Sequence, residues 1–231
     1  MATASRTTRE SRQARNARLA ATAAPKVNKF ALLSETLLLG VCLFVLALPV
    51  VTAPAAYAAG AAHMERHIAG RPDTIASLWT DFKAALPGSW KFGLALLGAG
   101  AVASVNLLLA GSEQLPGGRV VMAATLLLAG GLAVLLLRAA GLWQAERERA
   151  TSTVAQQTRS TADTPPSAWA GAWAQAKRDA ASDWIGTTLL VAALAMCLTF
   201  VWMLPPLVFI VPGAMTLAVV SVHYRQRGLQ A

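Results

Sequence analysis

Charged residues are scarce in this chain of 231 residues. Only 13% of its residues are Asp, Glu, Lys or Arg, whereas a soluble globular domain carries roughly 25%. Hydrophobic residues make up 55% of the chain, and they are gathered in long runs. Because a membrane-spanning helix needs about 20 mostly apolar residues, the composition predicts an integral membrane protein with room for about four to six spans.

Cysteine and the usual signs of catalysis are also scarce. Cys42 and Cys197 both lie inside apolar runs, which is typical of buried small side chains rather than of a disulfide or metal framework. The sequence has no phosphate-binding glycine loop, no paired carboxylates and no nucleophile elbow. We therefore expect no enzyme active site, and we expect no cofactor.

Basic residues outnumber acidic ones by 20 to 11, which gives a net charge of +9. They lie outside the apolar runs and form no nucleic-acid recognition motif, so we expect contact with anionic lipid and no contact with nucleic acid. The polar, basic composition of residues 1–29 predicts a disordered basic cytoplasmic tail. The tail either attracts anionic lipid or only fixes the topology. Its arginines recur at every third position, at Arg6, Arg9, Arg12, Arg15 and Arg18.

The apolar runs predict an all-α bundle of about six spans within one domain, residues 30–224. Spans are expected at about 30–49, 50–68, 91–110, 119–141, 184–204 and 206–223. The final 39-residue run is divided at Leu204, because Pro205 suits the first turn of a new helix. The second span is short: residues 50–64 cover only about 22 Å. Its small residues favour close packing, so neighbouring helices are expected to shield it.

The first apolar run has an alternative interpretation as a signal peptide. The sequence Ala-Tyr-Ala at 56–58 resembles the small-residue cleavage site that ends such a peptide. However, the basic region before the run is long for a signal peptide, and further membrane segments follow. We therefore favour a retained first span.

Two amphipathic segments, 74–86 and 167–178, are expected to lie as helices in the membrane interface. In the first, Asp73 or Thr74 is expected to cap the helix, and Asp81 and Lys83 lie on the polar face. In the second, Trp169 and Trp173 are four residues apart. An internal repeat relates the segments at an offset of 94 residues. The repeat pairs Trp79, Lys83 and Trp90 with Trp173, Lys177 and Trp184.

The basic residues also predict the orientation, because they favour the cytoplasmic side. Of the 20 basic residues, 18 lie in the tail, in 64–91, in 143–183 or at the C-terminal end. All four regions are cytoplasmic only if the six spans form three hairpins. Residues 143–183 are then a cytoplasmic loop, and 225–231 are a C-terminal cytoplasmic tail. The alternative has five spans and places the N-terminal tail outside.

A resemblance rests on two motifs. Leu-Pro-Val-Val-Thr at 48–52 ends an apolar helix, and a small-residue segment and an aromatic amphipathic segment follow it. Over residues 30–110 this resembles the YesL family of bacterial membrane proteins. The chain departs from the family at 34–36, where Ser-Glu-Thr replaces the common Leu-Asn-Leu, and in its long basic tail. The matching positions, whose role the resemblance leaves open, are Leu48, Pro49, Thr52, Trp79, Asp81, Phe82 and Trp90.

The resemblance, to a family of unknown function, implies an integral protein of the bacterial inner membrane with an accessory role in carbohydrate uptake, partnered by transporter subunits. A small transporter or channel-like oligomer is the alternative. Two polar positions within spans are candidates for function, Glu35 and Asn106. Asn106 is expected to form a helix–helix hydrogen bond. His63 and His67 share a helix face, but two ligands alone make no zinc site.

Overall fold

The structure is a computed structural model that describes residues 29–111, 117–157 and 167–230. It divides into two units, Met1–Ser34 and Glu35–Ala231. Only residues 29–34 of the first unit are described, and they begin helix α2. The predicted basic tail and its lipid contact therefore lie outside the described residues, apart from Lys29. All that follows concerns the second unit.

Every described element is a helix, which confirms the all-α fold class. In chain order the elements are α2 (Lys29–Ala47), η1 (Val50–Thr52), α3 (Ala53–Ile68), α4 (Ile75–Gly111), α5 (Gly118–Gln157), α6 (Ala168–Ser182), α7 (Trp184–Met203), η2 (Pro205–Phe209) and α8 (Val211–Gln230). Among the described residues, three helices are long and apolar enough to cross a membrane: α4, α5 and α7. The protein is therefore a membrane protein.

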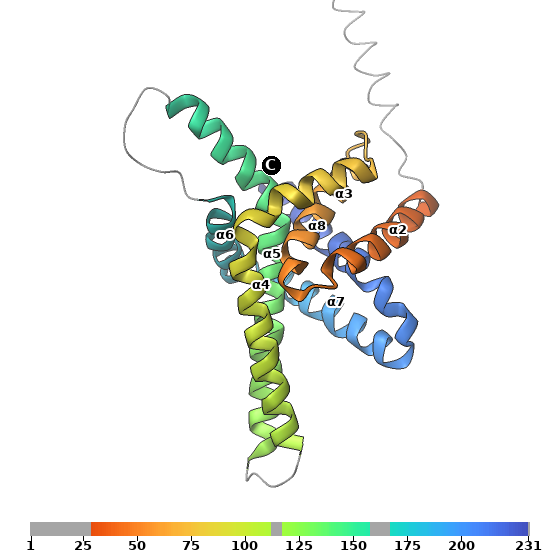
Figure 1. Cartoon of the computed structure of the whole chain (residues 1–231), viewed down its shortest axis with the longest axis vertical. Coiled ribbons are helices and arrows are strands. Elements are labelled where there is room, and N and C mark those ends of the chain that lie inside the picture. Colours follow the sequence, from red (N-terminus) through yellow and green to blue (C-terminus); the bar gives the residue numbers. More distant parts are fainter. Residues whose placement is uncertain (1–28, 112–116, 158–166, 231) are drawn as a thin grey trace, which may run out of the picture. The chain divides into compact units, whose positions relative to one another are not determined.

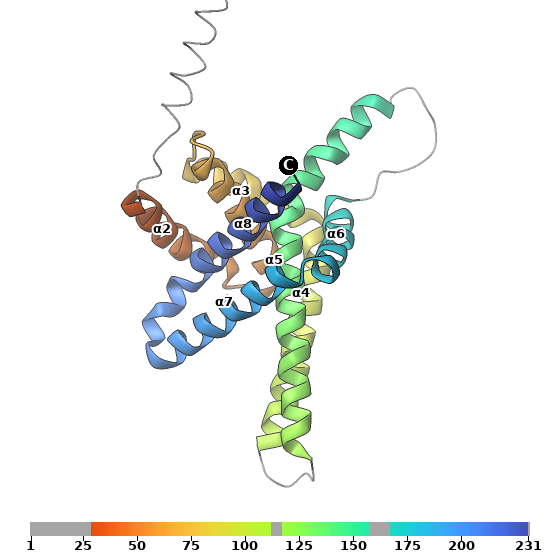
Figure 2. The same ribbon diagram turned by 180° about the vertical axis from the view of Figure 1, so that it is seen from behind.

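Helix α4 has two parts that differ in character. Its dihedral angles leave the helical region at Pro87 (ψ 116°) and Gly88 (φ 94°), which separates the amphipathic segment from the apolar one as the sequence predicts. The apolar part runs beside α5 in both views (Figures 1 and 2). Between the two helices, Asn106 Nδ2 donates to Thr125 Oγ1 at 3.4 Å. The expected helix–helix hydrogen bond is present.

Helix α3 is shielded by its neighbours, as its small residues predict. Its residues from Pro54 to Met64 are buried, except for the half-buried Tyr57. The helix packs against α4, α5 and α8, and Gly60 allows the side chain of Leu43 to approach it closely. At 16 residues, α3 measures about 24 Å, so this cover compensates for its short length.

Two helix boundaries differ from the boundaries expected for the spans. Helix α5 continues to Gln157, where a loop was expected from residue 143. Strong helix formers fill this stretch, and Trp143 is buried beside the Trp169 ring at 6.3 Å. In the last apolar run, α8 begins at Val211 rather than at 206. The two prolines at 205 and 206 form η2 instead, because they cannot donate the backbone hydrogen bonds that a continuous helix needs.

The amphipathic helices bury their apolar faces within the protein. Phe82 and Trp169 are 6% and 2% exposed, and the Trp169 indole N–H donates to Ala85 O at 2.8 Å. These rings are core residues rather than the lipid anchors that the sequence suggested. Trp79 and Trp184, which belong to the repeat, are exposed. The helices exist as predicted, but they pack as a soluble-core helix would.

Candidate functional site

Ionisable side chains from four helices and one loop gather around the end of α3. We call them the polar cluster: Glu35, His63, Arg66, His67, Asp73, Asp81 and Arg147. Spacings of three and four residues place the three α3 side chains on one helix face. Helix α3 ends at Ile68, and Gly70 (φ 64°) follows its C-cap. Gly70 N donates to His67 O, and Arg71 N donates to Arg66 O. This glycine-dependent cap turns the chain back toward α4.

Two histidine–carboxylate pairs form one half of the cluster. His63 Nε2 lies 2.7 Å from Glu35 Oε1, and His67 Nδ1 lies 2.5 Å from Asp73 Oδ2. His63 is buried, and the other three are half-buried. Ligand atoms of Glu35, His67 and Asp73 lie within 4.8 Å of one another. Glu35, the polar candidate within the first span, is thus paired with a histidine that sequence spacing did not connect to it.

The electrostatics favour an ionised Asp73 in the loop between α3 and α4. Partial burial tends to raise the pKa of this carboxyl group, but the hydrogen bond and charge of His67 outweigh it and lower the pKa below its ordinary value. Asp73 thus remains an acceptor and a negative charge. Of the two residues predicted to cap the helix, Thr74 does so, since its Oγ1 accepts from Ser77 N at 3.2 Å, whereas the Asp73 carboxylate faces His67.

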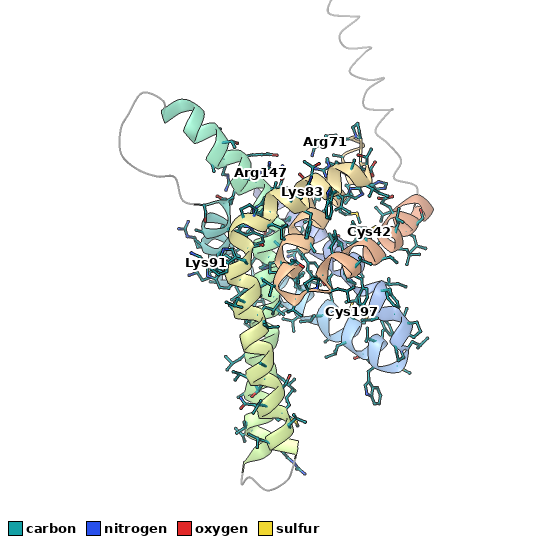
Figure 3. All side chains as sticks on the ribbon, in the orientation of Figure 1. Cys42, Arg71, Lys83, Lys91, Arg147 and Cys197 are labelled. Carbon is teal, nitrogen blue, oxygen red and sulfur yellow. The ribbon has the colours of Figure 1, made fainter. Side chains whose placement is uncertain are left out.

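Asp81 joins three helices in the other half of the cluster. Its carboxylate lies 2.6 Å from Arg66 Nη2 of α3 and 3.7 Å from Arg147 Nη1 of α5, and the residue is 8% exposed. The expectation that Asp81 faces the polar surroundings with Lys83 was therefore wrong for Asp81, because α3 and α5 cover it. Lys83 is exposed and lies 5.8 Å from the Trp79 ring (Figure 3).

The motif at 48–52 forms a turn that docks on α4. Thr52 Oγ1 donates to Leu46 O and to Pro49 O, each at 2.7 Å. This turn places the Val51 carbonyl against Gly93. A Cβ atom added at Gly93 would lie only 1.9 Å from Val51 O. The motif thus has a structural role, because it packs η1 against α4.

The remaining family-motif positions do not converge on one site. Leu48 and Pro49 are exposed at the η1 turn, and Trp90 is exposed on α4. Trp79 stacks on Phe82 with ring centroids 5.5 Å apart. Cys42 of α2 and Cys197 of α7 are half-buried free thiols (Figure 3).

A second buried network, which the sequence reasoning did not predict, surrounds Arg138. This side chain is 1% exposed, and its Nη2 donates to Asp183 Oδ2 at 3.3 Å and to Thr187 Oγ1 at 3.2 Å. Gln226 Nε2 of α8 donates to the same carboxylate at 2.9 Å. The network ties α5, α7 and α8 together. A lone arginine inside the run LLLRAAG is the signal that could have found it.

Asp183 is held as a carboxylate by this network. Burial tends to raise its pKa, but the Gly186 N–H and the hydrogen bonds from Arg138 and Gln226 outweigh burial and lower the pKa. The carboxylate also caps α7, since Oδ1 accepts from Gly186 N at 3.0 Å. One side chain thus serves both a helix terminus and a buried arginine.

An apolar cavity of about 140 Å³ lies among five helices. The first turn of α3, with Pro54 and Tyr57, borders it, as do Leu194 of α7 and Met215 of α8. Almost all of its wall is hydrocarbon. A ligand that suits this cavity would be apolar. A sugar would not suit it, because a sugar needs several precisely placed polar partners.

Neither a family model nor a curated protein nor a solved structure matches this chain. The resemblance to the YesL family therefore stays a prediction. What the residues show of function must come from the polar cluster, the Arg138 network and the exposed apolar helices.

Proposed function

We propose that this protein is a multi-pass accessory protein of the bacterial inner membrane that binds the membrane subunits of a carbohydrate uptake system. The observation that supports it best is the exposure of the hairpin formed by α4 and α5. In the most apolar stretch of α4, only 6% of the residues are buried, and in that of α5 only 22%. These helices meet little of the part of the chain that the structure describes, and we propose that lipid or a partner's helices cover them.

One face of the hairpin suits a partner helix better than lipid. Gly98, Ala99 and Ala103 of α4 and Ala129 of α5 line a shallow groove. Small residues let a second transmembrane backbone approach closely. Asn106 and Thr125 border the groove and offer polar contacts there. We propose a transmembrane helix of a transporter subunit as the occupant, and the carbohydrate specificity comes from the family resemblance.

A photocrosslinking amino acid in the groove tests the proposal. Placed at Ala99, it is expected to form an adduct with a membrane subunit of a sugar transporter, identified by mass spectrometry from the native membrane. The matched control is Leu97, an exposed residue of the same helix that does not line the groove. Adducts with lipid alone, or equal adducts at both positions, would rule out this docking face.

We also propose six spans with both chain ends in the cytoplasm. The spans are α2, α3, the apolar part of α4, the first part of α5, α7 and α8. The shielding of α3 by its neighbours supports its crossing despite its length. The positive-inside rule supports the orientation. The polar cluster and the charged end of α5 then lie on the cytoplasmic side.

Cysteine labelling of intact cells separates six spans from five. In a chain with Cys42 and Cys197 replaced by alanine, Ser11→Cys is expected to resist a membrane-impermeant maleimide, because the tail is cytoplasmic. Leu204→Cys is the external control, which should be labelled, and Arg71→Cys is the internal control. Labelling of Ser11→Cys from outside, with the controls unchanged, would establish five spans.

A small transporter is the second candidate, and the apolar cavity favours it. The first turns of α3 and α8 both border this cavity, through Pro54 and Val211. Transporters often place their substrate where interrupted helices meet. Purified protein that moves a solute across vesicle membranes without any partner would favour this candidate over the accessory role.

A further inference from the structure

We propose that Glu35, His67 and Asp73 bind one divalent metal ion of the Zn²⁺ type. They come from α2, from the last turn of α3 and from the loop before α4. Their ligand atoms lie within 4.8 Å of one another. Each side chain is half-buried, so an ion can reach it from the polar side while the helices hold it in place.

The donor set selects the class of metal. One imidazole nitrogen with two carboxylate oxygens suits Zn²⁺ better than Mg²⁺ or Ca²⁺, which favour oxygen ligands alone. Bonds of about 2.0–2.2 Å in a tetrahedron require ligand atoms about 3.3–3.6 Å apart. For an ion to bind, His67 Nδ1 and Asp73 Oδ2, which are 2.5 Å apart, must move apart. The pairs of ligand atoms that are farther apart than this range must move closer together. Rotations of half-buried side chains accomplish both.

His63 supplies an independent support for the site. Its ring is 3% exposed, and its Nε2 contacts Glu35 at 2.7 Å. Metal-binding carboxylates are commonly oriented by such an outer hydrogen bond. Its Nδ1 is buried and has no hydrogen-bond partner among the described residues. A nearly buried histidine is therefore aimed at the carboxylate that would bind the ion.

The surrounding charges leave the site net negative. Glu35 and Asp73 contribute two carboxylates to the site. The nearest arginine of α3, Arg66, is engaged by Asp81 at 2.6 Å. The ion would clamp α2 to the α3–α4 loop. With three protein ligands, a fourth position stays open for water or an anionic group.

Titration with Zn²⁺ tests the site. The full chain, purified in detergent with a histidine-free tag and stripped by a chelator, is expected to bind one Zn²⁺ in competition with a chromophoric chelator. Glu35→Gln, His67→Gln and Asp73→Asn should each weaken binding by more than about 100-fold. His63→Gln should weaken it by only about 10–100-fold, as expected for an outer partner. His223→Gln, a histidine of α8 outside the cluster, should bind as the parent does.

X-ray absorption on the unmutated, zinc-loaded chain keeps the proposal testable if a variant misfolds by circular dichroism. It should show nitrogen and oxygen neighbours at about 2.0–2.2 Å, an imidazole signature and no sulfur. Less than half an equivalent of bound zinc, a sulfur neighbour, or ligand variants that bind like the parent would overturn the site. Because the readout is metal binding, its failure leaves the proposed partner contact of α4 and α5 unaffected.

Discussion

A Gly93→Ala variant is expected to be strongly destabilised. The added Cβ atom would lie 1.9 Å from Val51 O and 2.6 Å from Val51 C and Cα. These are backbone atoms, fixed by the two hydrogen bonds that Thr52 donates within the turn, so no side chain can rotate away. Overpacking of this kind costs about 3 kcal/mol or more, against a typical total stability of about 5–15 kcal/mol.

The measurement is the midpoint of thermal unfolding in detergent, followed by the monodisperse fraction in size-exclusion chromatography. Gly98→Ala is the matched control on the same helix, because no atom of the described residues lies within 4 Å of its added Cβ. The control should gain up to about 1 kcal/mol from the better helix propensity of alanine. Equal midpoints for the two variants would show that η1 does not dock on α4 as described.

The positions of the spanning helices could be predicted closely, because the length of each apolar run in the sequence determines them. The span expected at 91–110 corresponds to the apolar part of α4, which ends at Gly111. The span expected at 184–204 corresponds to α7, Trp184–Met203. Pro87 marks the break inside α4, as expected for a residue that lacks a backbone N–H. The same reasoning failed at Pro205, since two consecutive prolines form a short 3-10 turn before α8 can begin.

The polar cluster could not be predicted because its members meet only through tertiary packing. Glu35 and His63 are 28 residues apart, and Asp81 and Arg147 are still farther apart in sequence. Amphipathicity shows that Asp81 and Leu78 differ in polarity, but not that Arg147 of α5 approaches Asp81. Periodicity likewise cannot distinguish a helix that faces lipid from one that faces its own chain, and so Trp169 was assigned to the wrong environment.

An Asp183→Ala variant is expected to be destabilised by about 3–5 kcal/mol, because it leaves the charge of a buried arginine uncompensated. Arg138 is 1% exposed and donates to the lost carboxylate. The substitution also removes the α7 cap and the partner of Gln226. Thermal unfolding in detergent, compared with the parent, measures the loss.

The double variant Arg138→Met/Asp183→Ala decides what causes that loss. If the uncompensated charge dominates, replacing the arginine with a hydrophobic side chain of similar length should recover much of the stability. If the α7 cap dominates, the double variant should be no more stable than Asp183→Ala alone. Glu146→Ala is the control, because it breaks an ion pair whose arginine, Arg149, is 69% exposed, and such pairs contribute less than about 1 kcal/mol. A control that loses as much as Asp183→Ala would show that burial of Arg138 is not what makes its pairing important.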